Sequence, residues 1–264
     1  MTRTVRNDNI ASLGYTLEIT EDAARVKPLL DACNLSGPPS HSVGTTFLVA
    51  TTRAGGVAAA VAWSCVGEGL AVLQSLAVAP SSRGSGIGAS QLASAMLHLR
   101  EELDIEAIYI RADGAAGFFS GFGFEDVEEG TVPRPVANHP VFMDGDGRQM
   151  VRRYGEPRRA LDHTAFCLIH NTTADATLPV GSVFWFRQSG PALEAQYRGG
   201  SVLRGHLLGA RDEDKLRFLW QSCTTDGRLL RGEGEILMRV LDDGRRELRE
   251  RLGEDPGELL LREL

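Results

Sequence analysis

The sequence predicts an α+β domain followed by an all-β antiparallel meander. Up to about Tyr154, strand-like and helix-like segments alternate along the chain. From about His163 onward, short alternating strands are separated by regular turn signals, which favours closure into a barrel or a sandwich. Between these two parts, the polar stretch 154–159 contains Gly and Pro and is typical of a domain boundary.

The 264 residues are enough for two ordinary domains. We expect an N-terminal extension at 1–13, an α+β domain at 14–154, a linker at 155–162 and a β-meander domain at 163–264. A net charge of -7 argues against nucleic acid as a partner, because neutralising phosphates needs a basic surface. No apolar run is long enough to span a bilayer and residues 1–13 lack a signal core, so we expect no membrane partner and a cytoplasmic protein. The four scattered cysteines indicate neither a disulfide framework nor a metal site.

In the first part, we expect helices at 21–33, at 86–103 and at 115–121, with Thr20 as the N-cap of the first. Apolar spacing places Leu92, Met96, Leu99 and Leu103 on one face of the second helix. The expected strands are 14–19, 46–51, 57–66, 70–78, 106–111, 124–127 and 149–154, with turns at 54–56, 67–69 and 144–147.

In the second part, strict alternation at 182–188 and 215–221 indicates strands with one buried face. The turn signals that separate the strands are at 189–190, 199–200, 209–212, 225–227, 242–244 and 255–257.

The segment Arg83-Gly84-Ser85-Gly86-Ile87-Gly88 follows the apolar strand 70–79 and opens a helix. Glycines let a backbone approach a ligand closely, and the N–H groups of a first helical turn attract anions. The spacing fits neither the Walker A loop nor the dinucleotide fingerprint. We therefore predict a phosphate-binding loop here, the alternative being an ordinary turn.

This loop and its strand resemble the pyrophosphate loop of the GNAT N-acetyltransferases, in which Arg/Gln-x-x-Gly-x-Gly/Ala holds the diphosphate of acetyl-CoA. The segment 118–124, Phe-Phe-Ser-Gly-Phe-Gly-Phe, resembles a second landmark of that family. Within the family, residues 14–154 are most similar to small N-acetylglutamate-synthase-like enzymes linked to arsenic resistance. The resemblance implies a mixed central sheet flanked by helices, with acetyl-CoA as co-substrate.

The resemblance also implies roles for particular residues. The backbone around Leu76, Ala77 and Val78 would hold the pantetheine arm and the acetyl carbonyl. The remaining cofactor-binding candidates are in the loop and in the aromatic pair: Arg83, Gly84, Ser85, Gly86, Ile87, Gly88 and Phe119.

The catalytic side chains depart from the family pattern. The aromatic pair Phe118-Phe119 has no titratable group where many relatives have Tyr as a general acid. Cys65 stands where we would expect Glu, and Gln74 where we would expect Arg. Three catalytic candidates remain. Cys65 could be an acyl-carrying nucleophile. Ser75 or Ser120 could donate a proton to the thiolate, and a water chain could be the base.

The second part resembles a family of small bacterial β-proteins that sometimes carry the name N-acetylglutamate synthase by association. The resemblance lies in 197–209, 216–221, 226–227 and 232–234, and it implies a lipocalin- or avidin-like meander. A barrel that binds a small ligand is one interpretation. Tyr197 and His206 are read as core or surface residues rather than ligand contacts.

We therefore expect an acetyl-CoA-dependent N-acetyltransferase, an acyltransferase of groups other than amino-acyl groups, which acts by direct transfer on a small amine such as an amino acid. The alternative is a catalytically degenerate protein that binds acyl-CoA and serves as a regulator or ligand-binding protein. Acetylation of a protein N-terminus or lysine is a third, weaker option. Homodimer formation stays open.

Overall fold

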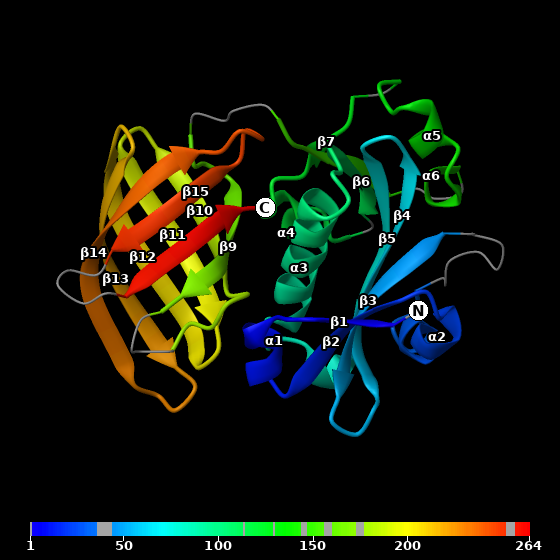
Figure 1. Cartoon of the computed structure of the whole chain (residues 1–264), viewed down its shortest axis with the longest axis horizontal. Helices are drawn as coiled ribbons and strands as arrows, with labels where there is room; N and C mark the ends of the chain where they lie inside the picture. Colours follow the sequence, from blue (N-terminus) through cyan, green and yellow to red (C-terminus); the bar gives the residue numbers. More distant parts are fainter. Residues whose placement is uncertain are drawn as a thin grey trace. The chain divides into compact units, whose positions relative to one another are not determined.

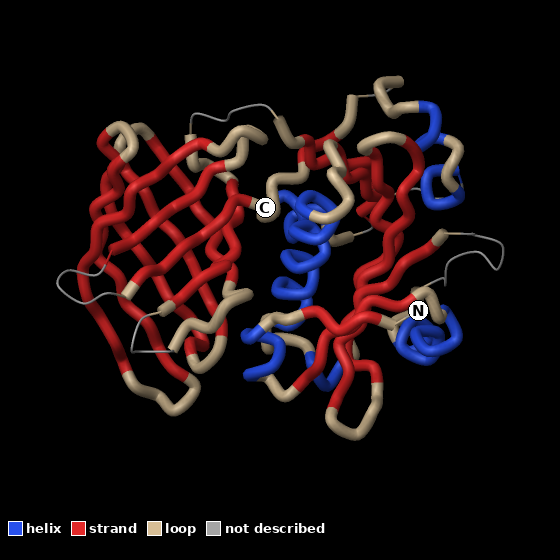
Figure 2. Tube along the Cα trace, in the orientation of Figure 1, coloured by secondary structure: helices blue, strands red, loops and turns tan. Residues whose placement is uncertain are grey.

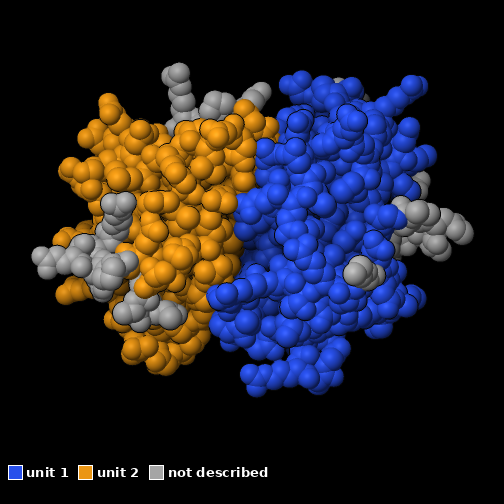
Figure 3. Space-filling model, in the orientation of Figure 1, with its two compact units in different colours: residues 1–120, 124–153 blue, residues 121–123, 154–264 orange. Residues whose placement is uncertain are grey.

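The computed structural model describes residues 2–35, 44–112, 114–128, 130–143, 147–155, 160–172, 177–251 and 257–264, with Arg251 described by its backbone alone. Most of the expected 144–147 turn, half of the expected 155–162 linker and part of the expected 255–257 turn lie outside these residues. The chain divides into two compact units (Figure 3): residues 1–120 with 124–153, and residues 121–123 with 154–264.

Unit 1 is built on one eight-stranded sheet in the order β1-β2-β3-β4-β5-β6-β8-β7 (Figure 1). Its neighbouring strands pair antiparallel except for β5 and β6, which run parallel. The strands are β1 (Arg3–Val5), β2 (Tyr15–Thr20), β3 (Thr45–Thr52), β4 (Val57–Gly67), β5 (Leu70–Val78), β6 (Ala107–Ala112), β7 (Glu125–Asp126) and β8 (Arg148–Arg153).

The sheet begins earlier than the sequence analysis predicts. Strand β1 and helix α1 (Asp8–Ser12) both lie within the first 13 residues, and β1 pairs with β2. The Asn7 side chain caps α1 by accepting from the Ile10 N–H at 2.9 Å. These elements are too short to give a periodic pattern, which is why sequence alone did not indicate them.

Helices α2 (Ala23–Ala32) and α3 (Ile87–Glu101) cover opposite faces of the sheet (Figure 1). The expected N-cap Thr20 is wrong: Asp22 caps α2 by accepting from the Ala24 N–H at 3.0 Å, and Thr20 instead accepts from the N–H of Asp22. The expected placement of Leu103 on the inner face of α3 is also wrong, because the helix ends at Glu101 and Leu103 is 42% exposed.

The remaining helices of unit 1 are short. They are η1 (Pro80–Ser82), α4 (Ala116–Ser120), α5 (Arg134–Ala137) and α6 (Pro140–Met143), and of these only α4 corresponds to an expected helix, the one at 115–121. No helix in the described residues is both long and apolar enough to cross a membrane.

Unit 2 is a closed antiparallel barrel in which eight strands form a ring (Figure 2), so the barrel rather than the sandwich is confirmed. β9 pairs with both β10 and β16, so the ladder has no free edge. The strands are β9 (Thr164–Asn171), β10 (Val183–Ser189), β11 (Ala192–Gly199), β12 (Val202–Asp212), β13 (Lys215–Thr224), β14 (Leu229–Val240), β15 (Arg246–Arg251) and β16 (Glu258–Glu263).

The turn expected at 209–212 is wrong. Residues 209–212 continue β12, and Gly209 lies opposite Phe218 of β13. A Cβ at Gly209 would lie 2.2 Å from the Arg217 carbonyl oxygen and 2.7 Å from Phe218 Cβ, so this glycine serves close strand packing.

Three more pairs place a glycine opposite an aromatic residue inside the barrel. Their registers are Tyr197↔Gly205, Trp220↔Gly232 and Phe218↔Gly234. A Cβ on the glycine would lie between 2.1 and 2.7 Å from the ring in each pair. The rings therefore lie flat across the glycines and cover the glycine backbone, which no side chain would otherwise cover. Tyr197 is a buried core residue and His206 is exposed, which agrees with the core-or-surface expectation.

Candidate active site

The central feature of unit 1 is the divergence of β5 from β6. β5 pairs with β4 along its length, but its parallel pairing with β6 covers only Leu70–Leu73. The edge of residues 74–78 that faces β6 thus has no partner strand among the described residues. The predicted cofactor-binding residues Leu76, Ala77 and Val78 lie on this segment.

The backbone orientation of this segment follows from its register. The Ala79 N–H donates to the Ala58 carbonyl at 2.8 Å. Because hydrogen-bonded positions alternate along an antiparallel pair, Ala77 directs its backbone groups toward β4, whereas Leu76 and Val78 direct theirs away from β4. The Val78 carbonyl agrees with this orientation, since it accepts from Arg83 Nε at 3.1 Å and from Cys33 Sγ at 3.4 Å.

The glycine-rich loop connects η1 to α3. Gly84 has φ +78° and Gly86 has φ +87°, a left-handed backbone that favours glycine. Gly86 is the N-cap of the 15-residue helix α3 and provides no capping side chain. Ser85 Oγ donates to the Ser82 carbonyl at 2.7 Å and accepts weakly from the Ile87 N–H at 3.4 Å. No acidic residue lies in the first turn of α3, so the positive end of the helix dipole is not neutralised there.

Two predicted loop residues have additional structural roles. A Cβ at Gly88 would lie 3.1 Å from Val78 Cγ2, so the absence of a side chain lets α3 approach β5 closely. The Arg83 guanidinium folds back toward the end of β5, with Nη2 3.8 Å from Cys33 Sγ. Its charge therefore lies at the carboxyl end of β5, beside the end of α2.

Beside the open edge is a polar cluster that the sequence analysis did not assemble. The β4–β5 register shifts between Ala62 and Trp63, and Gln74 occupies the resulting bulge. Gln74 Nε2 donates to Thr45 Oγ1 at 3.1 Å and to Ser64 Oγ at 2.5 Å. Gln74 Oε1 is buried and accepts no hydrogen bond from the described residues. The bulge depends on strand register, which the sequence does not display.

The three predicted catalytic residues do not form one group. Ser75 adjoins Gln74 and lies opposite Ala62 of β4, within the open edge of 74–78. Cys65 lies opposite Ala71, three positions further along β4, or about 10 Å away at the rise of a strand. Desolvation raises the pKa of the Cys65 thiol, which disfavours the reactive thiolate.

Ser120 and Phe119 follow β6, the strand that diverges from β5. They lie on α4, which follows the carboxyl end of β6, and parallel strands β5 and β6 end at the same edge of the sheet. Phe119 is 5% exposed and its ring packs edge-on against Phe118 and Phe124, at centroid distances of 5.2 and 5.7 Å. Phe118 is the exposed member of the pair, so Phe119 as a cofactor contact remains a prediction.

The comparisons with known proteins agree with both resemblances. Residues 44–126 match the family model of the acetyltransferase (GNAT) domain, and residues 159–262 match that of avidin-like proteins. The GNAT resemblance and the β-protein resemblance are thereby confirmed. GNAT acetyltransferases use acetyl-CoA, the co-substrate expected from the sequence. A search of curated protein sequences found no significant match.

Similar solved structures include a GNAT-family acetyltransferase from Staphylococcus aureus, with 16% identity, a TM-score of 0.39, and coverage of 58% of this chain and 98% of that one. A putative acyl-CoA N-acyltransferase from Klebsiella pneumoniae has 17% identity and a TM-score of 0.41, with coverages of 53% and 97%. The N-acetylglutamate synthase from Neisseria gonorrhoeae, complexed with coenzyme A and N-acetyl-glutamate, has 17% identity and a TM-score of 0.41, with coverages of 58% and 34%.

Proposed function

We propose that residues 14–154 transfer the acetyl group of acetyl-CoA directly to a small amine, an amino acid or a similar compound. The observation that carries this proposal is the open edge of β5, which adjoins a glycine-rich helix N-terminus within the segment that matches the GNAT family model. Each part of this arrangement suits one part of acetyl-CoA.

The open edge suits the pantetheine arm. Backbone groups of Leu76 and Val78 that point away from β4 can pair with the amides of the arm, as a neighbouring strand would. The diphosphate would bind at the backbone of residues 83–88, where the positive helix end and the Arg83 guanidinium both favour an anion. Gly84 and Gly86 have no side chain to obstruct this approach.

The acceptor amine would approach the thioester from the side of the polar cluster. The neutral amine nitrogen attacks the acetyl carbonyl, the C–N bond forms, and the C–S bond breaks after the tetrahedral stage. One proton leaves the nitrogen and one reaches the departing thiolate. We assign the second transfer to Ser75 or Ser120 and the first to a water chain, because the two side chains that bind Gln74 at the bulge, Thr45 and Ser64, are hydroxyls that cannot act as a base at neutral pH. The buried Gln74 Oε1 is a suitable acceptor for a donor on the substrate.

A measurement of thiol release tests the proposal. Acetyl-CoA is offered with a panel of amino acids and polyamines, beside calorimetry of CoA binding. Turnover on one class of amine supports an acetyltransferase. Tight CoA binding without turnover on any amine supports instead the alternative, a degenerate acyl-CoA-binding regulator. Cys65→Ala should leave turnover unchanged, whereas Ser75→Ala and Ser120→Ala identify the proton donor by a loss of kcat.

The loop assignment has its own test. Gly86→Asp places a carboxylate at the proposed diphosphate site, whereas Gly86→Asn has the same shape without the charge, and both residues tolerate a left-handed backbone better than others. We expect Asp to weaken CoA binding at least about tenfold relative to Asn in calorimetry. Equal affinities of the two variants would refute the assignment. Cytoplasmic residence, a homodimer, the absence of nucleic-acid and membrane partners, and the 155–162 linker remain predictions.

A further inference from the structure

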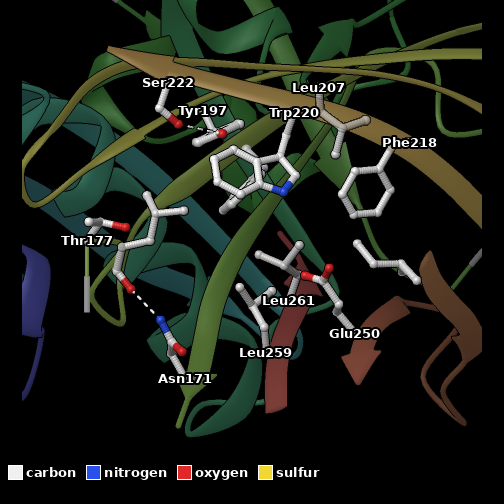
Figure 4. Close-up of a pocket in the computed structure, with 13 residues that line it drawn as sticks. Asn171, Thr177, Tyr197, Leu207, Phe218, Trp220, Ser222, Glu250, Leu259 and Leu261 are labelled. Carbon is white, nitrogen blue, oxygen red and sulfur yellow. Dashed lines mark hydrogen bonds between the residues drawn. The ribbon is translucent and has the colours of Figure 1, made fainter. Parts of the chain in front are cut away.

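The interior of the barrel contains a cavity of about 180 Å³. It lies in the half of the barrel nearer the β11–β12 and β13–β14 turns, and its wall is mainly apolar (Figure 4). Phe184, Leu207, Phe218, Trp220, Leu259 and Leu261 form most of that wall. The volume is of the order of the engineered apolar cavity of about 150 Å³ that accepts benzene, so it suits a single aromatic ring.

The glycines of β12 and β14 create this space. Because Gly205, Gly232 and Gly234 have no side chains, the rings of Tyr197, Trp220 and Phe218 lie flat on the sheet instead of projecting into the centre. The opposite half of the barrel is filled by buried side chains that include Phe166, Phe186 and Leu248.

Most polar groups on the cavity wall have partners. The Tyr197 hydroxyl and Ser222 Oγ are 2.8 Å apart, and Asn171 Nδ2 donates to the Leu178 carbonyl at 2.7 Å. Glu250 differs from these groups: it is 8% exposed and lines the cavity, yet no described residue donates a hydrogen bond to it or forms an ion pair with it.

The surroundings of Glu250 explain this isolation. On β14 it lies opposite Ile236, and its side chain extends over Gly234, where a Cβ would stand 2.3 Å from Glu250 Oε1. On β16 its neighbours in the wall are Leu259 and Leu261. Four arginines of β14, β15 and β16 pair with other carboxylates: Arg239, Arg246, Arg249 and Arg262.

Two neighbouring carboxylates show the contrast. Glu247 is contacted by Arg239, by Arg249 and by Arg262, and Glu263 forms a paired contact with Arg246 at 2.8 and 2.9 Å. A buried carboxylate normally has such a partner, because burial of an unpaired charge is costly. Glu250 instead faces an aromatic-walled cavity that can hold a partner.

We propose that this cavity is a binding site for a small organic cation: one flat apolar group of about the size of a benzene ring, with a protonated amine that pairs with Glu250. The amine supplies the missing donor and the compensating charge, and the Trp220 and Phe218 rings accept the apolar group and the edge of the cation. A ligand with a carboxylate at the same end would be repelled. This site lies wholly in unit 2 and does not depend on the proposed acetyl transfer.

Binding of such a cation should depend on pH in a defined direction. Burial raises the pKa of Glu250 to about 7, so the free carboxyl becomes protonated as the pH falls through neutrality. The other titratable group that faces it is Tyr197 of β11, whose own pKa is raised by burial and which stays neutral here. Gly234 and Ile236 of β14 do not titrate, and neither do Leu259 and Leu261 of β16. Arg246, which lies on β15 as Glu250 does, is paired with Glu263.

The test is calorimetry of the full chain with three probes of similar size: phenethylamine, phenethyl alcohol and phenylacetate. We expect phenethylamine to bind and the other two to bind at least about tenfold more weakly. Its affinity should fall about 100-fold from about pH 8 to about pH 5, because the ionised carboxylate becomes scarce.

Glu250→Gln keeps the shape, removes the charge and should fold, since it eliminates a buried ionisable group. We expect this variant to bind phenethylamine at least about tenfold more weakly and without the pH dependence, while the control Glu235→Gln, on an exposed residue, behaves as the parent. Equal binding of phenethyl alcohol, an unchanged affinity in Glu250→Gln, or no binding of any of a series of arylalkylamines up to about 10 mM would each overturn the proposal.

Discussion

At the scale of single residues, Glu250 should reduce stability at neutral pH. Its folded pKa of about 7 lies above the ordinary value of 4.5, so the folded state holds a proton that the unfolded state has lost. The carboxyl therefore contributes stability below about pH 4.5, and this contribution is lost as the pH rises through about 7. The shift corresponds to up to about 3 kcal/mol.

Denaturant unfolding of the parent and Glu250→Gln at several pH values checks this expectation. The variant should gain stability relative to the parent as the pH rises from acid to neutral, because the difference isolates one carboxyl from all others that titrate. A difference that stays constant over the whole window would contradict the raised pKa.

The Arg246–Glu263 pair presents the opposite situation, a buried charge with its partner. The two side chains are 1% and 4% exposed, and the Arg246 N–H also donates to Glu263 Oε2 at 3.0 Å. Glu263→Ala leaves a buried guanidinium unpaired and should cost about 3–5 kcal/mol of unfolding free energy. The double variant Arg246→Met with Glu263→Leu should recover most of that loss, since apolar residues of similar volume can replace a buried pair. If the double variant is no more stable than the single one in denaturant unfolding, the pair itself stabilises the barrel.

At the scale of elements, Gln91 fixes α3 on the sheet. Its side chain is fully buried, and Nε2 donates to the Leu48 carbonyl at 2.7 Å and to the Ala59 carbonyl at 3.1 Å, so one helix residue binds both β3 and β4. Because α3 begins at the glycine loop, the position of α3 on the sheet also determines the position of the loop.

We expect Gln91→Leu to lower the unfolding free energy by about 1–3 kcal/mol, because two buried carbonyls lose their donor. The KM for acetyl-CoA should rise while kcat changes little. The matched control is Gln149→Leu on β8, a half-buried position outside α3. An unchanged melting temperature would show that the two carbonyls need no donor from α3.

Elements also differ in how far the sequence predicts them. The glycine loop at 83–88 can be predicted because its glycines follow an apolar strand and precede a long helix, a signal contained in one local segment. The bulge at Gln74 and the early end of β5–β6 pairing were not found, since both are properties of register between strands distant in sequence. Gly209 was misread as a turn because a glycine that accommodates Phe218 has the same local signature as a glycine that bends the chain. The sequence also does not indicate that Glu250 lines a cavity. Its neighbours in sequence are like those of Glu247, and only the structure shows that the Glu250 side chain points into the barrel.

At the scale of the whole molecule, the hydrogen-bonding of the barrel is complete within one stretch of the chain. All eight strands lie between Thr164 and Glu263, and the ring closes through β9 and β16. The sheet of unit 1 lies between Arg3 and Arg153. Neither ladder requires a strand from the other unit, so we propose that the sheet and the barrel each fold on their own when the chain is divided at 155–162, although residues 121–123 group with unit 2.

Expression of residues 160–264 and of residues 1–154 as separate fragments tests this. We expect the first to give an all-β circular dichroism spectrum and a cooperative thermal transition, and the second to retain CoA binding in calorimetry. The control is the shorter fragment 160–245, which lacks β15 and β16. This truncation leaves β14 and β9 as unpaired edges, so the fragment should aggregate. If residues 160–264 behave no better than this truncated fragment, then closure of the barrel is insufficient for folding and the two units form one cooperative structure.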